Sequence, residues 1–422
     1  MKRWVESAEL HLAELLRPGD GVIWGQACAE PQTLVEALVA QRASLGGVSI
    51  FLGVNYAGIV KPEHADHLRL SAYCGLGHNR AIADAGVLDI HPHPYSRLGA
   101  LIRERRIRAD VVFVQTSPPN EKGEYSLGLA AEYLIPALDC CRVVVAEVND
   151  QVPWTYTDRL LRETDIEIAV RSSRSPALPP SSARGETERA IARYATAFVP
   201  DGGTLEIGFG AAPAAVLEGL ADRRDLGVHT GALGEGVANL MRSGAITNAH
   251  KPIDRGCTVG GFLFGTRTLF DFVHRNEAVR LASSDYTHDP AVLGRLERFV
   301  AINSAVEVDL TGQVNAEVAG GSYVGAVGGA LDFVRAANRS PGGVSLCVLP
   351  SAVGTRASRI VARLSGPVAT PRSEAGVVVT EHGAADLRGL GLAERARRMI
   401  AIAHPAFREQ LERQVRENGL LR

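Results

Sequence analysis

The feature that most constrains the fold is a strand-loop-helix-strand pattern that occurs twice, once near the start of the chain and once near its middle. The first copy has PGDGVIWG (18–25), then Pro31 and LVEAL (34–38); the second has PDGGTLEIG (200–208), then Pro213 and VLEGL (216–220). A second strand follows in each copy, VSIFLG (48–53) and VHT (228–230). Each copy predicts one β-loop-α-β unit, whose proline opens the helix in its first turn, where a missing N–H costs nothing.

Parallel strands joined by helices predict the α/β class, with sheets covered on both faces. The 422 residues are enough for two domains. A serine- and proline-rich stretch, 172–183, is the predicted linker, which gives domains of 1–182 and 183–422. Beyond it, 186–197 has helical spacing, and further apolar runs, 299–310, 344–349 and 376–379, alternate with turn signals. Two such halves facing one another would hold a ligand at the carboxyl ends of their strands.

Several functional classes are excluded by composition and by missing motifs. A formal net charge of -2 gives no field for nucleic acid or a membrane surface. No window approaches the roughly 18 apolar residues that a membrane helix needs, and an N-terminal signal is absent, so we expect a cytoplasmic protein. The six cysteines form no CxxC pair, and His91 and His93 lack a third ligand, so we expect no metal. The motifs GxGxxG, GK(S/T), GxSxG and HExxH are absent, which disfavours nicotinamide, ATP, serine-hydrolase and zincin chemistry.

Two glycine-rich loops and one polar segment are the candidate functional elements. The loop IGFGAAP (207–213) can let its backbone approach a ligand and aim a helix N-terminus at an anion; tight strand-to-helix packing is the alternative. The loop GAVGGALDF (325–333) can point backbone N–H groups outward as an oxyanion nest, with Asp332 bracing the next turn, or it is a structural turn. The segment EVDLTGQVNAE (307–317) suits either the rim of a site or an ordinary polar hairpin.

Seven stretches together resemble the acetyl-CoA hydrolase/transferase family. In family order they are QTSPPNEKG (115–123), GFGAAP (208–213), GAITN (244–248), VDLTGQVNAE (308–317), GGALDF (328–333), TEHGAADLRG (380–389) and IAHPAF (402–407). The resemblance covers nearly the whole chain. It implies the CoA-transferase fold, which has two similar open α/β domains with parallel sheets and the active site between them. It also implies acyl-CoA and a small-molecule acceptor as ligands, coenzyme A as the only cofactor, and a homodimer or homotetramer.

The family's usual chemistry depends on a glutamate. Its carboxylate attacks the thioester, and an acyl-glutamyl anhydride and then a glutamyl-CoA thioester carry the groups to an incoming carboxylate. A carboxylate suits this work because its anhydride keeps the acyl group activated. The family's glutamate follows a His-Ser or His-Thr pair, whereas here His229 and Thr230 are followed by Gly231. Glu235 lies four residues on and resembles the acidic residue of the family's Asp-Gly-Val instead.

We therefore predict an enzyme that acts on an acyl-CoA thioester without a glutamyl-CoA intermediate, by acyl transfer or hydrolysis. Ordinary CoA transfer to a carboxylate by another residue and a catalytically inactive acyl-CoA-binding protein remain alternatives. The candidate acid, base and positioning residues are His229, Glu235 and Asn315. By resemblance, the residues that hold coenzyme A and polarise the thioester carbonyl are Gly208, Gly210, Ala211, Pro213, Gly325, Val327, Gly328 and Gly329.

Overall fold

The computed structural model describes residues 3–180, 185–354 and 356–417. Contacts divide the chain into two compact units. The first unit comprises Met1–Pro180, Gly231–Glu235 and Thr258–Asp289, and the second comprises Ser181–Thr230, Gly236–Cys257 and Pro290–Arg422. The predicted domain boundary at 182/183 lies outside the described residues.

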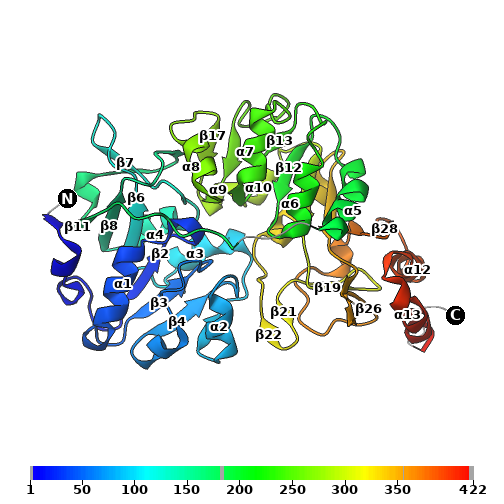
Figure 1. Cartoon of the computed structure of the whole chain (residues 1–422), viewed down its shortest axis with the longest axis horizontal. Coiled ribbons are helices and arrows are strands. Elements are labelled where there is room, and N and C mark those ends of the chain that lie inside the picture. Colours follow the sequence, from blue (N-terminus) through cyan, green and yellow to red (C-terminus); the bar gives the residue numbers. More distant parts are fainter. Residues whose placement is uncertain (1–2, 181–184, 355, 418–422) are drawn as a thin grey trace. The chain divides into compact units, whose positions relative to one another are not determined.

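The first unit is built on an eight-stranded sheet whose strand pairs are all parallel (Figure 1). In spatial order its strands are β1 (Arg3–Val5), β11 (Ile168–Ser172), β8 (Val143–Asn149), β6 (Val111–Thr116), β2 (Gly21–Trp24), β3 (Ser49–Leu52), β4 (Arg69–Ala72) and β5 (Leu88–Ile90). Its helices are α1 (Gln32–Gln41), α2 (Asn79–Asp84), α3 (Leu98–Arg103), α4 (Leu134–Cys140), α8 (Arg267–Val273) and α9 (Ser284–Thr287).

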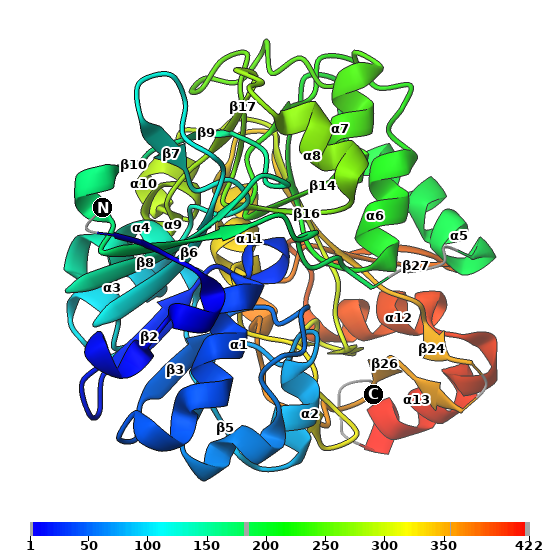
Figure 2. The same ribbon diagram turned by 60° about the vertical axis from the view of Figure 1, so that its left-hand side comes forward.

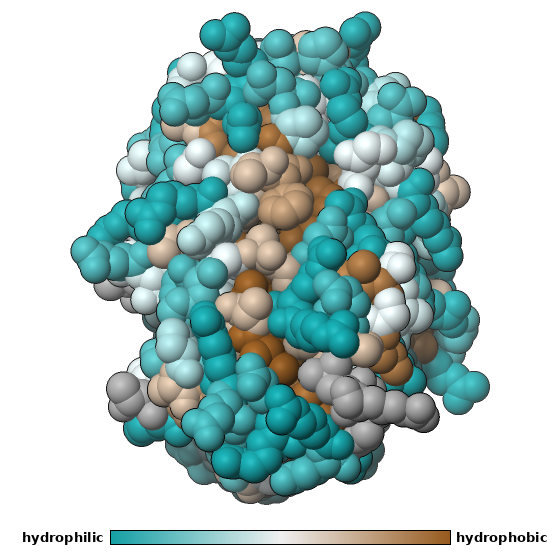
Figure 3. Space-filling view, turned by 90° about the vertical axis from the view of Figure 1, so that its right-hand side faces the viewer, coloured by the Kyte–Doolittle hydropathy of each residue, from teal (hydrophilic) through white to brown (hydrophobic). Residues whose placement is uncertain are grey.

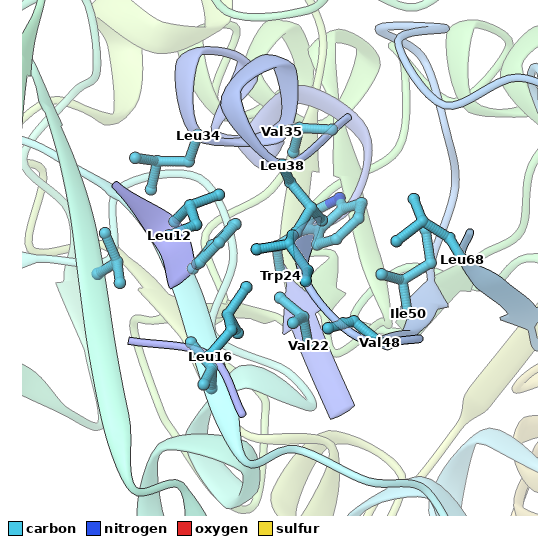
Figure 4. Packing of buried hydrophobic residues seen from close by; sticks show 14 of the residues in the cluster. Leu12, Leu16, Val22, Trp24, Leu34, Val35, Leu38, Val48, Ile50 and Leu68 are labelled. Atoms are coloured by element: carbon cyan, nitrogen blue, oxygen red, sulfur yellow. The ribbon is translucent and has the colours of Figure 1, made fainter. Parts of the chain in front are cut away.

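Both faces of this sheet are covered, as the continuous apolar runs predict. Leu34 and Leu38 of α1 pack against Trp24 and its neighbours on one face (Figure 4). Ile23, which points to the opposite face because side chains alternate along a strand, is also fully buried. The first unit therefore has a core on each side of its sheet.

Smaller sheets complete the first unit. One of them places β14 beside β16 in parallel, directly after Gly231. The strands are β7 (Glu124–Ser126) with β10 (Leu160–Arg162), β14 (Ala232–Gly234) with β16 (Phe262–Phe264), and β15 (Thr258–Gly260) with β17 (Val279–Leu281) and β9 (Tyr156–Thr157). Helix α7 (Glu235–Arg242) starts with the last residue of this segment and continues in the second unit.

The second unit has a six-stranded sheet that is parallel except for its last strand, β28. Its order is β13 (Gly227–Val228), β12 (Thr204–Ile207), β18 (Phe299–Asn303), β23 (Val344–Val348), β27 (Val377–Thr380) and β28 (Gly383–Asp386). Short strands are β19 (Glu307–Asp309), β20 (Val314–Asn315), β21 (Val318–Ala319), β22 (Ser322–Tyr323), β24 (Ala352–Val353), β25 (Ala357–Ser358) and β26 (Ile360–Val361). The helices are α5 (Glu186–Ala195), α6 (Ala211–Glu218), α10 (Pro290–Leu293), α11 (Ala330–Arg339), α12 (Leu392–Ile402) and α13 (Pro405–Glu417).

The predicted duplication is confirmed. In the first copy, β2, α1 and β3 follow one another and the two strands pair in parallel; in the second copy, β12, α6 and β13 do the same. Pro31 immediately precedes α1, and Pro213 lies in the first turn of α6. The α/β class with mostly parallel sheets is confirmed as well.

The end of the chain in the second unit is a pair of helices, α12 and α13, which lie side by side in both ribbon views (Figures 1 and 2). Met399 of α12 and Leu411 and Val415 of α13 share one buried cluster.

A cavity of about 570 Å³ lies against α13 and is lined by apolar and charged residues, among them Ile360, Phe407 and Arg363. Figure 3 shows one face of the molecule, on which apolar residues lie at the surface between hydrophilic ones. Within the described ranges, no helix is long and apolar enough to cross a membrane.

Candidate active site

The first glycine loop follows β12 in the second unit. The Gly208 N–H donates to the Ile302 carbonyl at 2.8 Å, and a Cβ on Gly208 would lie 2.5 Å from Asn303 Oδ1. Gly210 has φ +126°, which favours glycine, and it directly precedes α6. A Cβ on Gly210 would lie 3.6 Å from the Ser304 Cβ. The glycines therefore let the ends of β12 and β18 approach closely, and the helix that follows begins at the loop.

The second glycine loop precedes α11. Gly325 and Ala326 donate their N–H groups to the carbonyls of Glu317 and Ala316, at 3.0 and 3.2 Å. Gly328 has φ +55°. Within the described part of the chain, the N–H groups of the following residues, Val327, Gly328 and Gly329, donate to no protein acceptor. Together with the N-terminus of α11 they offer several donors for an anion or an oxyanion.

A small cavity inside the second unit is lined by neighbours of both loops. Its volume is about 30 Å³, and Asn303, Ser304, Ala316 and Ala330 are among the residues that line it. Asn303 and Ser304 contact the first loop, and Ala330 directly follows the second. The structure therefore brings both predicted coenzyme-binding loops to the same part of this unit.

A buried carboxyl, Glu206, lies in β12 immediately before the first loop. Asn303 Nδ2 donates to Glu206 Oε2 at 2.7 Å. Burial raises the pKa of Glu206 from an ordinary value of 4.5 to about 8, so the side chain is mostly neutral at pH 7. Sequence reasoning missed it, although a single glutamate inside the apolar strand TLEI is a visible signal.

His229 directly follows β13 and is fully buried. Its backbone N–H donates to the Leu205 carbonyl at 3.0 Å. The hydroxyl of the next residue, Thr230, bonds the backbone N–H and carbonyl of Ile207 at 3.2 and 3.3 Å. The His-Thr pair therefore lies beside the strand end from which the first glycine loop begins.

Gly231 and Glu235 belong to the first unit. The Gly231 carbonyl accepts from the N–H groups of Gly261 and Phe262 at 2.9 and 3.2 Å. Glu235 Oε1 accepts from the Thr266 N–H at 3.0 Å and from the Thr266 hydroxyl, at the start of α8. Glu235 thus fixes the position of Thr266, the residue directly before α8.

Asn315 is fully buried and braces a hairpin. Its Nδ2 donates to Glu307 Oε1 at 3.0 Å and to the Val318 carbonyl at 2.8 Å, and its Oδ1 accepts from the N–H groups of Glu317 and Val318. These bonds occupy the donors and acceptors of the side chain, which suits a positioning role better than proton transfer. They also favour the polar-hairpin interpretation of this segment.

The buried cysteines are poorly suited to nucleophilic attack. Burial raises the pKa of both Cys28 and Cys74 to about 12, so their thiols are protonated at neutral pH. A residue that sequence reasoning missed is Glu132, a glutamate with no exposed surface in the apolar run 127–134. It lies near Gly231 in the first unit, where a Cβ on Gly261 would approach both residues.

Comparison with known proteins identifies the family. The model of the acetyl-CoA hydrolase/transferase N-terminal domain matches residues 2–174, and that of the C-terminal domain matches residues 265–415. The chain is 38% identical over 401 residues to the 4-hydroxybutyrate coenzyme A transferase of Clostridium kluyveri, with 92% of each chain covered.

Two crystal structures have the same fold. RipA from Yersinia pestis is 29% identical with a TM-score of 0.94, and 4-hydroxybutyrate CoA-transferase from Porphyromonas gingivalis is 32% identical with a TM-score of 0.83. Each match covers 99% of this chain and 98% of the other. Both family models and the near-complete coverage agree with the seven sequence stretches that carried the resemblance. The chain therefore belongs to the acetyl-CoA hydrolase/transferase family, whose members act on acyl-CoA thioesters.

Proposed function

We propose that this protein is an enzyme that acts on an acyl-CoA thioester without a glutamyl-CoA intermediate, either by acyl transfer to an acceptor or by hydrolysis. The observation that carries the proposal is the sequence His229-Thr230-Gly231, which has glycine where the family's nucleophile is expected. Glycine has no group that can form an anhydride or a thioester. The acceptor must then attack the thioester directly.

The two glycine loops support binding of coenzyme A. The N–H groups of Val327, Gly328 and Gly329 can stabilise the oxyanion that develops when the thioester carbonyl is attacked. The loop that contains Gly208, Gly210, Ala211 and Pro213 would approach the coenzyme through its backbone. His229 is the proposed acid and Asn315 the proposed positioning residue. Glu235, the candidate base, accepts hydrogen bonds from the N–H and the hydroxyl of Thr266.

Ordinary CoA transfer with Glu235 as nucleophile is the second candidate, because the relative from Clostridium kluyveri is named a coenzyme A transferase. Two observations weigh against it. Glu235 Oε1 is bonded to Thr266, and Glu235 lies four residues beyond the expected position. An error of about 1 Å in alignment already costs about 100-fold in rate.

We further propose that coenzyme A takes part as the acyl-CoA substrate, that no metal is used, and that the protein forms a homodimer or homotetramer. The division into domains of 1–182 and 183–422 also remains a proposal.

The test is to incubate the protein with a panel of acyl-CoAs, with and without acetate and other carboxylates, beside a Gly231→Glu variant. Free CoA and new CoA esters are followed by mass spectrometry. We expect the wild type to form no new CoA ester and the variant to transfer CoA onto carboxylates. Formation of new CoA esters by the wild type would overturn the proposal in favour of Glu235 or another nucleophile.

A further inference from the structure

A buried glutamate, Glu132, lies close to Gly231 along the chain segments of the first unit. The Gly261 N–H donates to the Gly231 carbonyl, and the Ala131 N–H donates to the Gly261 carbonyl, each at 2.9 Å. The three segments are therefore neighbours, and Glu132 is the next residue after Ala131. A Cβ on Gly261 would lie 2.8 Å from Gly231 O and 3.5 Å from the Glu132 Cβ. Because residue 261 is glycine, no side chain separates Glu132 from Gly231 there.

The pairing of β14 with β16 indicates which face is involved. Ala232 is paired with Phe262 in parallel, and the same register, extended back by one residue, pairs Gly231 with Gly261. Paired residues in neighbouring strands face the same side of a sheet. A side chain at position 231 would therefore start on the face that Glu132 also borders. Glycine at 231 places no side chain on this face.

The two oxygens of Glu132 have different surroundings. Oε2 accepts from Gln26 Nε2 at 2.5 Å and from the Tyr95 hydroxyl. Gln26 is held in turn by the Tyr73 hydroxyl, which donates to its Oε1 at 2.6 Å. Oε1 of Glu132 is buried and has no hydrogen-bond partner among the described residues. A buried carboxyl oxygen without a hydrogen-bond partner is costly whether or not it carries the proton, which points to a partner supplied by a ligand.

Burial, opposed by two hydrogen bonds, sets the pKa of Glu132. Burial raises its pKa to about 8, while the hydrogen bonds from Tyr95 and Gln26 lower it. The titratable groups around it are the phenols of Tyr73, Tyr95 and Tyr133 and the thiol of Cys74, and burial raises the pKa of each. The ring of His288 lies 4.8 Å from that of Tyr95. A base whose pKa lies near the working pH transfers protons most effectively.

We propose that Glu132 is the general base that removes a proton from the acceptor as the acceptor attacks the thioester, and that the acceptor is therefore water, an alcohol or an amine. This inference rests on the proposed function. A bond forms between the acceptor oxygen or nitrogen and the carbonyl carbon, and the carbon-sulfur bond breaks. Glu132 takes the acceptor's proton, and His229, the proposed acid, gives a proton to the departing CoA thiolate. The products are an acyl ester, amide or free acid and CoA-SH; Glu132 then loses its proton to solvent and His229 regains one. A carboxylate acceptor has no proton to give at neutral pH.

The test measures kcat/KM from about pH 6 to 9 with each acyl-CoA alone, and with ethanol, hydroxylamine or acetate as the acceptor. We expect the rate with a protic acceptor to rise with pH and to level off near pH 8. Glu132→Gln should lower kcat/KM by about 100-fold or more, and its kcat/KM should no longer rise with pH in a limb below pH 8. Tyr95→Phe removes a hydrogen bond that lowers the pKa of Glu132, so it should move the limb to higher pH. Tyr95→Phe leaves the Glu132 carboxyl in place, so it still tests the role of Glu132 if Glu132→Gln fails to fold.

Glu30→Gln is the matched control. Glu30 is also buried, its pKa is likewise raised to about 8, and its Oε1 accepts from the N–H groups of Tyr56 and Ala57. We expect this variant to keep the wild-type rate and pH profile. If Glu132→Gln keeps the rising limb, or if Tyr95→Phe leaves it in place, the role of Glu132 is refuted while the proposed function stands. A wild type that turns over no acyl-CoA at all overturns the proposed function, and this inference with it.

Discussion

Replacing Glu206 by glutamine should make the protein more stable, by an amount that grows with pH. The folded state holds the proton of Glu206 up to about pH 8, whereas the unfolded chain releases it near pH 4.5. Between these values the unfolded state binds fewer protons, so wild-type stability falls as pH rises, by about 1.4 kcal/mol per unit. The difference of about 3.5 units corresponds to about 5 kcal/mol as an upper limit. Glutamine keeps the acceptor for Asn303 and has no proton to lose.

The assay is urea unfolding of both proteins at pH 5 and at pH 8.5, followed by circular dichroism. All three tryptophans, Trp4, Trp24 and Trp154, lie in the first unit, so fluorescence follows that unit separately. Other buried carboxyls are the same in both proteins and cancel in the difference. Glu297→Gln, at an exposed position of the second unit, is the control and should show no such trend. Equal stability differences at the two pH values would refute the reasoning, because Glu206 would then be ionised in the folded protein.

Three further predictions concern stability and are checked by chemical unfolding. Gly208→Ala should cost about 1–3 kcal/mol, because the new Cβ would lie 2.5 Å from Asn303 Oδ1. The control is Gly389→Ala, where φ is +70° but a Cβ would meet open space. If Gly208→Ala loses no more stability than this control, the steric explanation is wrong. Leu38→Ala should cost about 2–5 kcal/mol by leaving a cavity against Trp24, whereas Leu178→Ala, at a position 48% exposed, should cost far less. Asn315→Ala should cost about 1–3 kcal/mol or more, since it removes the acceptor of two backbone N–H groups and the donor to the Val318 carbonyl. A neutral effect would show that water replaces the amide.

The sequence predicted the parts of the fold that depend on local pattern. The two β-loop-α-β copies were visible because a strand, a glycine loop, a proline and a helix recur at matching intervals, and the structure pairs their strands in parallel. The apolar runs 299–310, 344–349 and 376–379 contain strands β18 and β19, β23 and β27. Such local patterns can be recognised without knowing which distant residues pack against them.

Features that depend on contacts distant in sequence could not be predicted. Gly231 is hydrogen-bonded to Gly261, and Glu132 lies next to both, although these residues are far apart in the chain. Likewise, the polar hairpin at 307–317 was one of two interpretations of the sequence, but the hydrogen bond from Ser365 to Glu307 could not be read from that segment. The assignment of Gly231 to the nucleophile position rests on the resemblance and stays a prediction.

The central claim is that no glutamyl-CoA thioester forms in this protein. The most direct measurement is the intact mass of the wild type and of Gly231→Glu, each quenched in acid during turnover of an acyl-CoA with acetate present. We expect the wild type to keep the mass of the unmodified chain and the variant to gain the mass of covalently bound CoA. A wild type that carries bound CoA, mapped by peptide analysis to Glu235 or to any other carboxylate, would contradict the account.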